Sequence, residues 1–220
     1  MSASHDRLIH TLGAELRPVR RLWPPWLRTL GWLLALAAIA ALLFMHYGSA
    51  DMQRRWSGAP DLAWAGVGAL LTAISAAWAA FASGVPGRRP GLAWWPLPAA
   101  LLWLVASGLG CLREWIAPDT HVPSMHEASD CLLFIVSLSL PLSALLVVLL
   151  RRACPLRPVR TAVLVGLASA AASASLLEIG HAFDAAASDL LMHAIAVGLV
   201  VAVNAAMGGR LLSGSDRAPR

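Results

Sequence analysis

The sequence predicts an all-α membrane protein, a bundle of six transmembrane helices with both the N-terminus and the C-terminus in the cytoplasm. The chain is 58% hydrophobic and 13% charged, whereas soluble domains are about 25% charged. Six stretches are long and apolar enough to cross a bilayer, and arginines are concentrated in alternate connections. A soluble fold of 220 residues could not bury this much apolar surface, so lipid must surround most of it.

The six spans follow from the spacing of the charges, because a membrane helix needs about 20 mostly apolar residues. Uncharged runs cover residues 29–50, 62–87, 90–112, 131–150 and 190–209, and a sixth run (161–177) ends at Glu178. We expect a six-span membrane domain over 26–209, between a cytoplasmic N-terminal segment (1–25) and a cytoplasmic tail (210–220). The spans themselves are expected at approximately 27–48, 62–84, 91–112, 131–150, 160–180 and 189–208.

The fifth span is rich in small side chains. Gly166 is followed closely by an unbroken run of alanine and serine from Ala168 to Ser175. Small side chains let helix backbones approach each other closely in a membrane. We therefore expect this span at the centre of the bundle.

The distribution of charge predicts the orientation. With the N-terminus inside, the inner segments contain 14 of the 17 arginines and carry +11, whereas the outer segments carry −6, which together give the net +5. Such an excess of arginine on one side is the positive-inside signal. The basicity therefore reflects topology, with some attraction to anionic lipid head groups, and predicts no direct binding of nucleic acid.

The segment before the first span has the pattern of an amphipathic helix. Leu8, Leu12 and Leu16 recur at helical spacing, and Arg17 and Arg20 lie off that stripe. Two interpretations stay open, a helix that lies on the inner lipid head groups and a helix presented to the groove of a cytoplasmic partner. Exchange between lipid and partner would itself make a switch.

Cysteines, histidines and acids gather at the predicted outer face. Cys111 ends the third span and Cys131 begins the fourth, whereas Cys154 lies in an inner loop, where thiols stay reduced. An oxidising exterior permits a disulfide between Cys111 and Cys131. Beside these two cysteines, and in the loop between the fifth and sixth spans, lie the acids and histidines Asp119, His121, His126, Glu127, Asp130, Glu178, His181, Asp184, Asp189 and His193.

Three interpretations of this outer group stay open. It is a set of solvated loop side chains, a redox pair at Cys111 and Cys131, or a metal site that includes His181, Asp184 and His193. No tight metal-ligand motif occurs, so no cofactor is predicted beyond an unidentified metal ion. A phosphate-binding loop, a nucleophile elbow and a mid-membrane carboxylate pair are also missing from the sequence, which argues against an enzyme or a pump.

Several hydrophobic strings rich in proline and arginine follow one another in a set order, among them Pro24-Pro25-Trp26 and Val85-Pro86-Gly87-Arg88. The others lie at residues 8–12, 16–22, 80–81, 108–112, 131–133, 140–141, 151–158 and 208–212. In the order and spacing of these strings, most of the chain resembles the NrsF-type bacterial membrane anti-sigma factors. These are six-span proteins that sequester an extracytoplasmic-function sigma factor.

The resemblance implies an integral protein of the bacterial cytoplasmic membrane with a sigma factor as its partner at the cytoplasmic face. The N-terminal segment, with Leu8, Leu12, Leu16, Arg17 and Arg20, would take part in holding the sigma factor. Cysteines at the outer face would help to sense oxidative or metal stress.

The chain departs from the family pattern at one of these cysteines. In the family, one cysteine opens the fourth span, which Cys131 matches, and some members have a second cysteine in a His-Cys-Pro string between the fifth and sixth spans. This chain has Gly180-His181-Ala182 there, so either His181 keeps part of the site or Cys111 is the partner instead.

Two other classes of function remain as alternatives. The first is a small membrane transporter or metal-handling channel with an outer His/Asp/Cys entrance. It predicts a polar path that continues inward from His193, where the sequence offers only Asn204 and scattered serines. The second is a membrane subunit without chemistry of its own.

Overall fold

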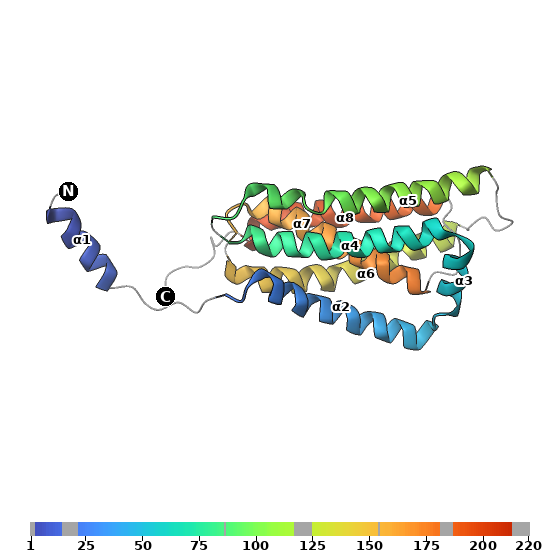
Figure 1. Ribbon diagram of the computed structural model, residues 1–220, viewed down its shortest axis with the longest axis horizontal. Coiled ribbons are helices and arrows are strands. Elements are labelled where there is room, and N and C mark those ends of the chain that lie inside the picture. The colour runs from blue at the N-terminus through green and yellow to red at the C-terminus, as the bar shows by residue number, and fades with distance from the viewer. Residues whose placement is uncertain are drawn as a thin grey trace.

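The computed structural model describes residues 3–14, 22–85, 87–116, 125–153, 155–180 and 187–212. These residues form eight α-helices and two short 3₁₀ helices, and a short N-terminal helix, α1 (Ala3–Ala14), lies apart from a bundle of the others (Figure 1). The elements of the bundle are α2 (Pro25–Tyr47), α3 (Ala50–Gly58), α4 (Pro60–Ser83), η1 (Pro90–Trp94), α5 (Leu97–Ile116), α6 (Met125–Leu150), η2 (Arg151–Ala153), α7 (Pro158–Gly180) and α8 (Ala187–Leu212).

Six of the described helices, α2 and α4 to α8, are long and apolar enough to cross a membrane. They lie side by side along the long axis of the bundle (Figure 1). Proline is the first residue of α2, α4 and α7, where its missing N–H would have no partner within the helix in any case. The predicted all-α fold with six long apolar helices is confirmed.

The helix α7 lies at the centre of the bundle, as its small residues predicted. In its most apolar stretch 78% of the residues are buried, compared with 67% in α4 and 28% or less in the other four long helices. It packs against α4, α6 and α8, and α5 packs against α4.

Two glycines mark places where helix backbones approach each other closely. A Cβ atom added at Gly68 of α4 would lie 2.6 Å from the backbone nitrogen of Trp103 in α5. One added at Gly166 of α7 would lie 2.8 Å from the Cα atom of Val201 in α8. Neither site has room for a larger side chain, which explains how α4 and α7 bury so much surface with few large residues.

The helix α2 is attached to the bundle through its first half. Its buried residues beyond Pro25 are Arg28, Thr29, Trp32 and Leu36. The indole nitrogen of Trp32 donates a hydrogen bond to the carbonyl of Leu142 in α6 at 3.2 Å. The other end of α2 diverges from the bundle (Figure 1), and an apolar cavity of about 400 Å³ lies between α2, α3, α4 and α7.

The two ends of the bundle differ in charge. One end, which we call the arginine-rich end, contains the start of α2, the connection from α4 to η1, the connection from α6 to α7, and the end of α8. Its described arginine side chains are Arg28, Arg88, Arg89, Arg151, Arg157, Arg160 and Arg210. The opposite end carries Arg54, Arg55, Asp61, Asp130 and Glu178.

Candidate functional site

Cys131 lies near the start of α6, at the end of the bundle opposite the arginine-rich end, and is buried in a small apolar cluster. The cluster, called here the Cys131 cluster, consists of Cys131 and Ile135 of α6, Leu177 of α7 and Ala196 of α8. Only 9% of Cys131 is exposed. Because packed interiors have little free volume, a change in the size or polarity of this thiol would act on three helices at once.

The predicted partner thiol, Cys111, belongs to α5, and its side chain lies outside the described residues. Among the described residues, α5 contributes none to the Cys131 cluster. The disulfide between Cys111 and Cys131 therefore stays a prediction. Cys154 also lies outside the described residues.

An ion pair ties α3 to the end of α7 beside this cluster. The guanidinium of Arg55 donates to the Glu178 carboxylate at 3.4 Å and also to the backbone carbonyl of Glu178. The two side chains are 9% and 22% exposed. The last carbonyls of a helix lack partners within it, so a cation here is favourable. Glu178 adjoins Leu177, so the ion pair holds the part of α7 that packs against Cys131.

Of the three residues predicted as a metal site, the structure describes one. His193 is half-buried in α8, one turn before Ala196 of the Cys131 cluster. His181 and Asp184 lie outside the described residues. Within the described ranges, no three His, Cys, Asp or Glu side chains gather as metal ligands would. The metal site stays a prediction.

At the other end of the molecule, α1 presents an exposed apolar face. Leu8, Ile9 and Leu12 are 56%, 62% and 57% exposed, and they lie on one side of the helix by their spacing. Such a face needs lipid or a protein partner to cover it. Outside the described residues lie the other predicted contact residues, Leu16, Arg17 and Arg20.

The arginine-rich end also contains a buried cation, Arg28, which directly precedes the first uncharged run of the sequence. Arg28 is 6% exposed, and it donates to the carbonyl of Phe81 at 3.4 Å and to that of Leu149 at 3.5 Å. Its guanidinium also lies 4.9 Å from the centre of the Phe81 ring. The signal that could have revealed it is the Pro24-Pro25 pair, because a helix that starts there places Arg28 inside its first turn.

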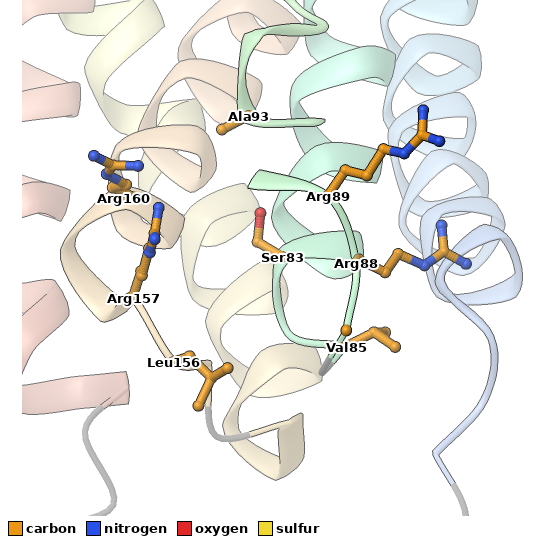
Figure 2. A pocket seen from close by; sticks show the side chains of 9 residues that line it. Ser83, Val85, Arg88, Arg89, Ala93, Leu156, Arg157 and Arg160 are labelled. Atoms are coloured by element: carbon orange, nitrogen blue, oxygen red, sulfur yellow. The ribbon is translucent and has the colours of Figure 1, made fainter. Parts of the chain in front are cut away.

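Four further arginines at this end are among the residues that line a hollow. Arg88 and Arg89 lie on the connection from α4 to η1, and Arg157 and Arg160 lie at the start of α7 (Figure 2). The side chains of Arg88 and Arg89 extend away from Arg157 and Arg160 (Figure 2), so the four guanidinium groups do not converge on the hollow.

Polar side chains inside the bundle are bonded to one another. Ser139 donates to Ser173 at 3.0 Å, and the amide of Asn204 donates to Ser143 at 3.2 Å. Neither the hollow at the arginine-rich end nor the apolar cavity beside α2 is lined by these side chains. They join α6 to α7 and α8, so they supply no observation in favour of a transport path from His193.

Comparison with known proteins identifies the family. A model of the family described as "NrsF: Negative regulator of sigma F" matches residues 12–213, which is most of the chain. No curated protein and no solved structure matches it. The match confirms the resemblance predicted from the order of the proline- and arginine-rich strings. The chain therefore belongs to the NrsF family, whose members are negative regulators of a sigma factor.

Proposed function

We propose that this negative regulator is an integral membrane anti-sigma factor. It holds an extracytoplasmic-function sigma factor at the cytoplasmic face of the bacterial inner membrane and releases it on oxidative or metal stress sensed at the outer face. The observation that carries the proposal is the family match over residues 12–213, which includes all six long apolar helices. Loops rich in arginine stay on the cytoplasmic side of membrane proteins, which favours the arginine-rich end as the cytoplasmic end. The role is binding, and no enzymatic step is part of it.

The exposed face of α1 is the best candidate for the contact with the sigma factor. Leu8 and Leu12 are one helical turn apart, and both are more than half exposed. An amphipathic helix of this kind binds a protein groove through residues at such spacing. The helix α1 and the start of α2 lie at the same end of the molecule (Figure 1), which is the side where the sigma factor would be held.

Co-purification tests both the function and the contact. Cells express the tagged full-length chain together with its sigma factor, and the amount of sigma factor recovered from solubilised membranes is measured. We expect recovery with the natural sequence and loss with the double variant Leu8→Asp and Leu12→Asp. The matched control, His10→Asp and Ala14→Asp, adds the same charge to the other side of α1 and should retain binding. Failure of the natural chain to recover the sigma factor would refute the proposed function, and retention by the Leu8/Leu12 variant would exclude α1 as the main contact.

Cys131 is the side chain through which we expect oxidative stress to act. Oxidation of a thiol to a sulfenic acid or a disulfide adds an oxygen or a covalent link. A polar atom placed among apolar side chains costs roughly 1–3 kcal/mol. Oxidation of Cys131 would therefore favour a second packing of α6, α7 and α8, and a stimulus acts only by favouring one of two arrangements.

The Arg55–Glu178 ion pair offers a route from this cluster to the N-terminal segment. A shift of Leu177 moves the end of α7, which Arg55 holds through both the side chain and the backbone of Glu178. Arg55 belongs to α3, which directly follows α2 in the chain. The first residue of α2, Pro25, directly follows the segment that carries α1. In this proposal the tilt of α2 changes the presentation of α1 to the sigma factor.

Differential alkylation tests the redox step. Samples are taken before and after the cells are treated with hydrogen peroxide. Because Cys131 is buried, its thiol is alkylated in each sample after acid denaturation. We expect peroxide to lower alkylation of Cys131 and to release the sigma factor in parallel. Loss of alkylation that requires Cys111 would identify a disulfide, and loss in the Cys111→Ser variant would identify sulfenic acid instead.

The Cys131→Ala variant supplies the decisive control, since alanine keeps the site small and apolar. It should hold the sigma factor in the presence of peroxide. Release from this variant at the rate of the natural chain would refute Cys131 as the sensor. Release by metal ions with Cys131 still fully alkylatable would instead favour a site at His181, Asp184 and His193.

A further inference from the structure

The apolar cavity beside the second half of α2 is large enough for a hydrocarbon ligand. It has a volume of about 400 Å³ and lies between α2, α3, α4 and α7, where α2 diverges from the bundle (Figure 1). Its lining side chains are mostly apolar, and they include Leu36 of α2, Leu70 of α4 and Leu176 of α7. An apolar cavity of about 150 Å³ already binds benzene, so this one has room for a longer hydrocarbon.

One end of the cavity carries a buried hydrogen-bond donor that has no acceptor. The indole nitrogen of Trp56 is buried, and no hydrogen-bond partner for it lies among the described residues. A Cβ added at Gly66 would lie 3.4 Å from Cζ2 of Trp56 and 3.6 Å from Cγ of Glu178. All three residues line the cavity, and a single ring atom separates Cζ2 from the indole nitrogen, so the donor lies at the cavity wall. Buried donors are nearly always bonded, so this one indicates an acceptor that a ligand would supply.

The charges at this end favour an uncharged acceptor. Among the described residues that line the cavity, Glu178 is the one with a charge, and Arg55 lies 3.4 Å from its carboxylate. This ion pair has no net charge, so a phosphate or a carboxylate placed there would be repelled by Glu178 without gaining a cation. The Ser175 hydroxyl already donates to the carbonyl of Ala172 at 2.8 Å. A carbonyl oxygen, which accepts a hydrogen bond without carrying a charge, suits the indole donor better.

The cavity opens toward the surface between α2 and α4. Phe44 of α2 and Val67 and Leu70 of α4 line it, and they are 37%, 37% and 42% exposed. Both helices are among the six that are long and apolar enough to cross a membrane, so in a bilayer this opening meets acyl chains. Trp56 lies in α3, at the end of these helices, which is the depth at which tryptophan typically meets the lipid head groups.

We propose that this cavity binds one acyl chain of a membrane phospholipid, whose ester carbonyl accepts a hydrogen bond from the indole N–H of Trp56. The acyl chain enters between α2 and α4 and packs against Leu36, Leu70 and Leu176. A phospholipid is the membrane component that joins a long hydrocarbon to an uncharged carbonyl at head-group depth. This inference depends on the placement of the protein in a bilayer and is independent of which sigma factor it binds.

Photocrosslinking locates the acyl chain. The purified full-length protein is placed in vesicles of phosphatidylcholine that contain a phosphatidylcholine with a diazirine on one acyl chain, and the adducts are mapped by mass spectrometry. We expect adducts on Leu36 and Leu176, which are 5% and 3% exposed and are reached only from within the cavity. Adducts confined to exposed residues such as Leu34 and Leu42 would leave this face to a protein partner or a second copy, and would overturn the proposal.

Filling the cavity should exclude the acyl chain. Ala40 of α2 lines the cavity and is half-buried, so Ala40→Phe should lose most adducts on Leu36 and Leu176. The matched control, Ala38→Phe, places the same ring at an exposed position on the other side of α2 and should keep them. Equal adducts in the two variants would refute the cavity as the binding site.

A comparison of ester and ether lipids tests the carbonyl. Unlabelled phosphatidylcholine with ester-linked chains should compete for the Leu36 adduct about threefold to tenfold more strongly than the diether lipid of equal chain length. Trp56→Phe keeps an aromatic ring but removes the donor, so the two lipids should compete equally with that variant. Trp64→Phe, at an exposed tryptophan of α4 at the same end, should keep the ester preference. Equal competition with the natural chain, or a preference that persists in Trp56→Phe, would refute the proposed hydrogen bond.

Discussion

At the scale of single residues, two buried arginines hold the ends of the long helices. Arg28 donates to carbonyls in the last turns of α4 and α6, and Arg55 does the same at the end of α7. Carbonyls in the last turn of a helix have no partner within it, and in a membrane water is scarce. A guanidinium has five donors in a planar fork, so it can serve two helix ends at once.

Replacing Arg28 should reveal what these bonds contribute. The variant Arg28→Met keeps most of the apolar stem but leaves the carbonyls of Phe81 and Leu149 without their donor, and we expect a loss of about 2 kcal/mol. Arg28→Lys can reach only one of the carbonyls well, so its stability should lie between those of the natural chain and the Arg28→Met variant. Thermal unfolding in detergent measures the effect, with Arg210→Met as an exposed control at the same end. A more stable Arg28→Met variant would mean that desolvation of the buried charge outweighs its hydrogen bonds.

The contact between Arg55 and Glu178 has two parts that mutation can separate. Glu178→Gln removes the carboxylate charge but keeps the backbone carbonyl, so we expect a loss below about 1 kcal/mol. Arg55→Gln removes both bonds and should cost about 2 kcal/mol. The double variant should be no less stable than Arg55→Gln alone, because the charge pair is already broken. A larger loss for Glu178→Gln than for Arg55→Gln in the same unfolding assay would contradict this division.

At the scale of helices, small residues determine which elements lie at the centre. The helices α4 and α7 are both rich in alanine, and their buried residues extend along most of their length. Lipid offers no hydrophobic driving force between apolar helices, so close packing and hydrogen bonds between helices must hold them together. The Ser139–Ser173 and Asn204–Ser143 bonds are such contacts.

Gly68 and Gly166, which lie at close approaches between helices, should tolerate substitution much less well than glycines of α5 and α8 that face open space. Gly68→Ala and Gly166→Ala would place a methyl group against a neighbouring backbone, and we expect each to cost about 1–3 kcal/mol. Gly108→Ala in α5 and Gly198→Ala in α8 meet nothing within 4 Å, and alanine favours a helix by up to about 1 kcal/mol. Thermal unfolding of the four variants should therefore separate them into two groups. Equal tolerance at all four sites would mean that the helices separate easily at these crossings.

The six spans could be predicted from the sequence, because lipid requires each of them to be a long run without charge. The central place of α7 followed from its small residues in the same way. The central place of α4 was not predicted, although its alanines from Ala65 to Ala82 carried the same signal. The short helix α3 was also missed, since its pattern is polar and its position depends on Arg55 reaching α7.

The candidate sites were less predictable than the spans. Cys131 was singled out from its place at the start of a span, but its neighbours Leu177 and Ala196 depend on the rotation of α7 and α8, which the packing decides. The hollow lined by Ser83 and Arg157 likewise depends on how two connections meet. Sequence patterns describe one element at a time, so contacts between distant elements were beyond them.

At the scale of the whole molecule, the proposed tasks are separated by the length of the bundle. The Cys131 cluster and the Arg55–Glu178 pair occupy one end, and the hollow beside Arg157 occupies the other, on the same side as α1 (Figure 1). Between them lie α4 and α7, whose tight packing favours motion of whole helices over local deformation. The fully buried residues of α2 all lie in its first half, whereas Ile39, Ala40 and Leu43 are only partly buried against the core, so we expect its second half to move more easily.

Because the two ends of the bundle have different proposed roles, the proposed function depends on the orientation of the bundle in the membrane. Two single-cysteine variants test this orientation. In a chain with Cys111, Cys131 and Cys154 replaced by serine or alanine, we place a single cysteine at exposed Ser57 of α3 or at exposed Leu156 of the arginine-rich end. A membrane-impermeant maleimide should label Ser57→Cys in intact spheroplasts and Leu156→Cys only after permeabilisation, because arginine-rich connections stay inside. The reverse result would place α1 outside the cell, where it could not reach a sigma factor. Labelling of both positions in intact spheroplasts would mean that the six long helices do not separate the two ends across the bilayer.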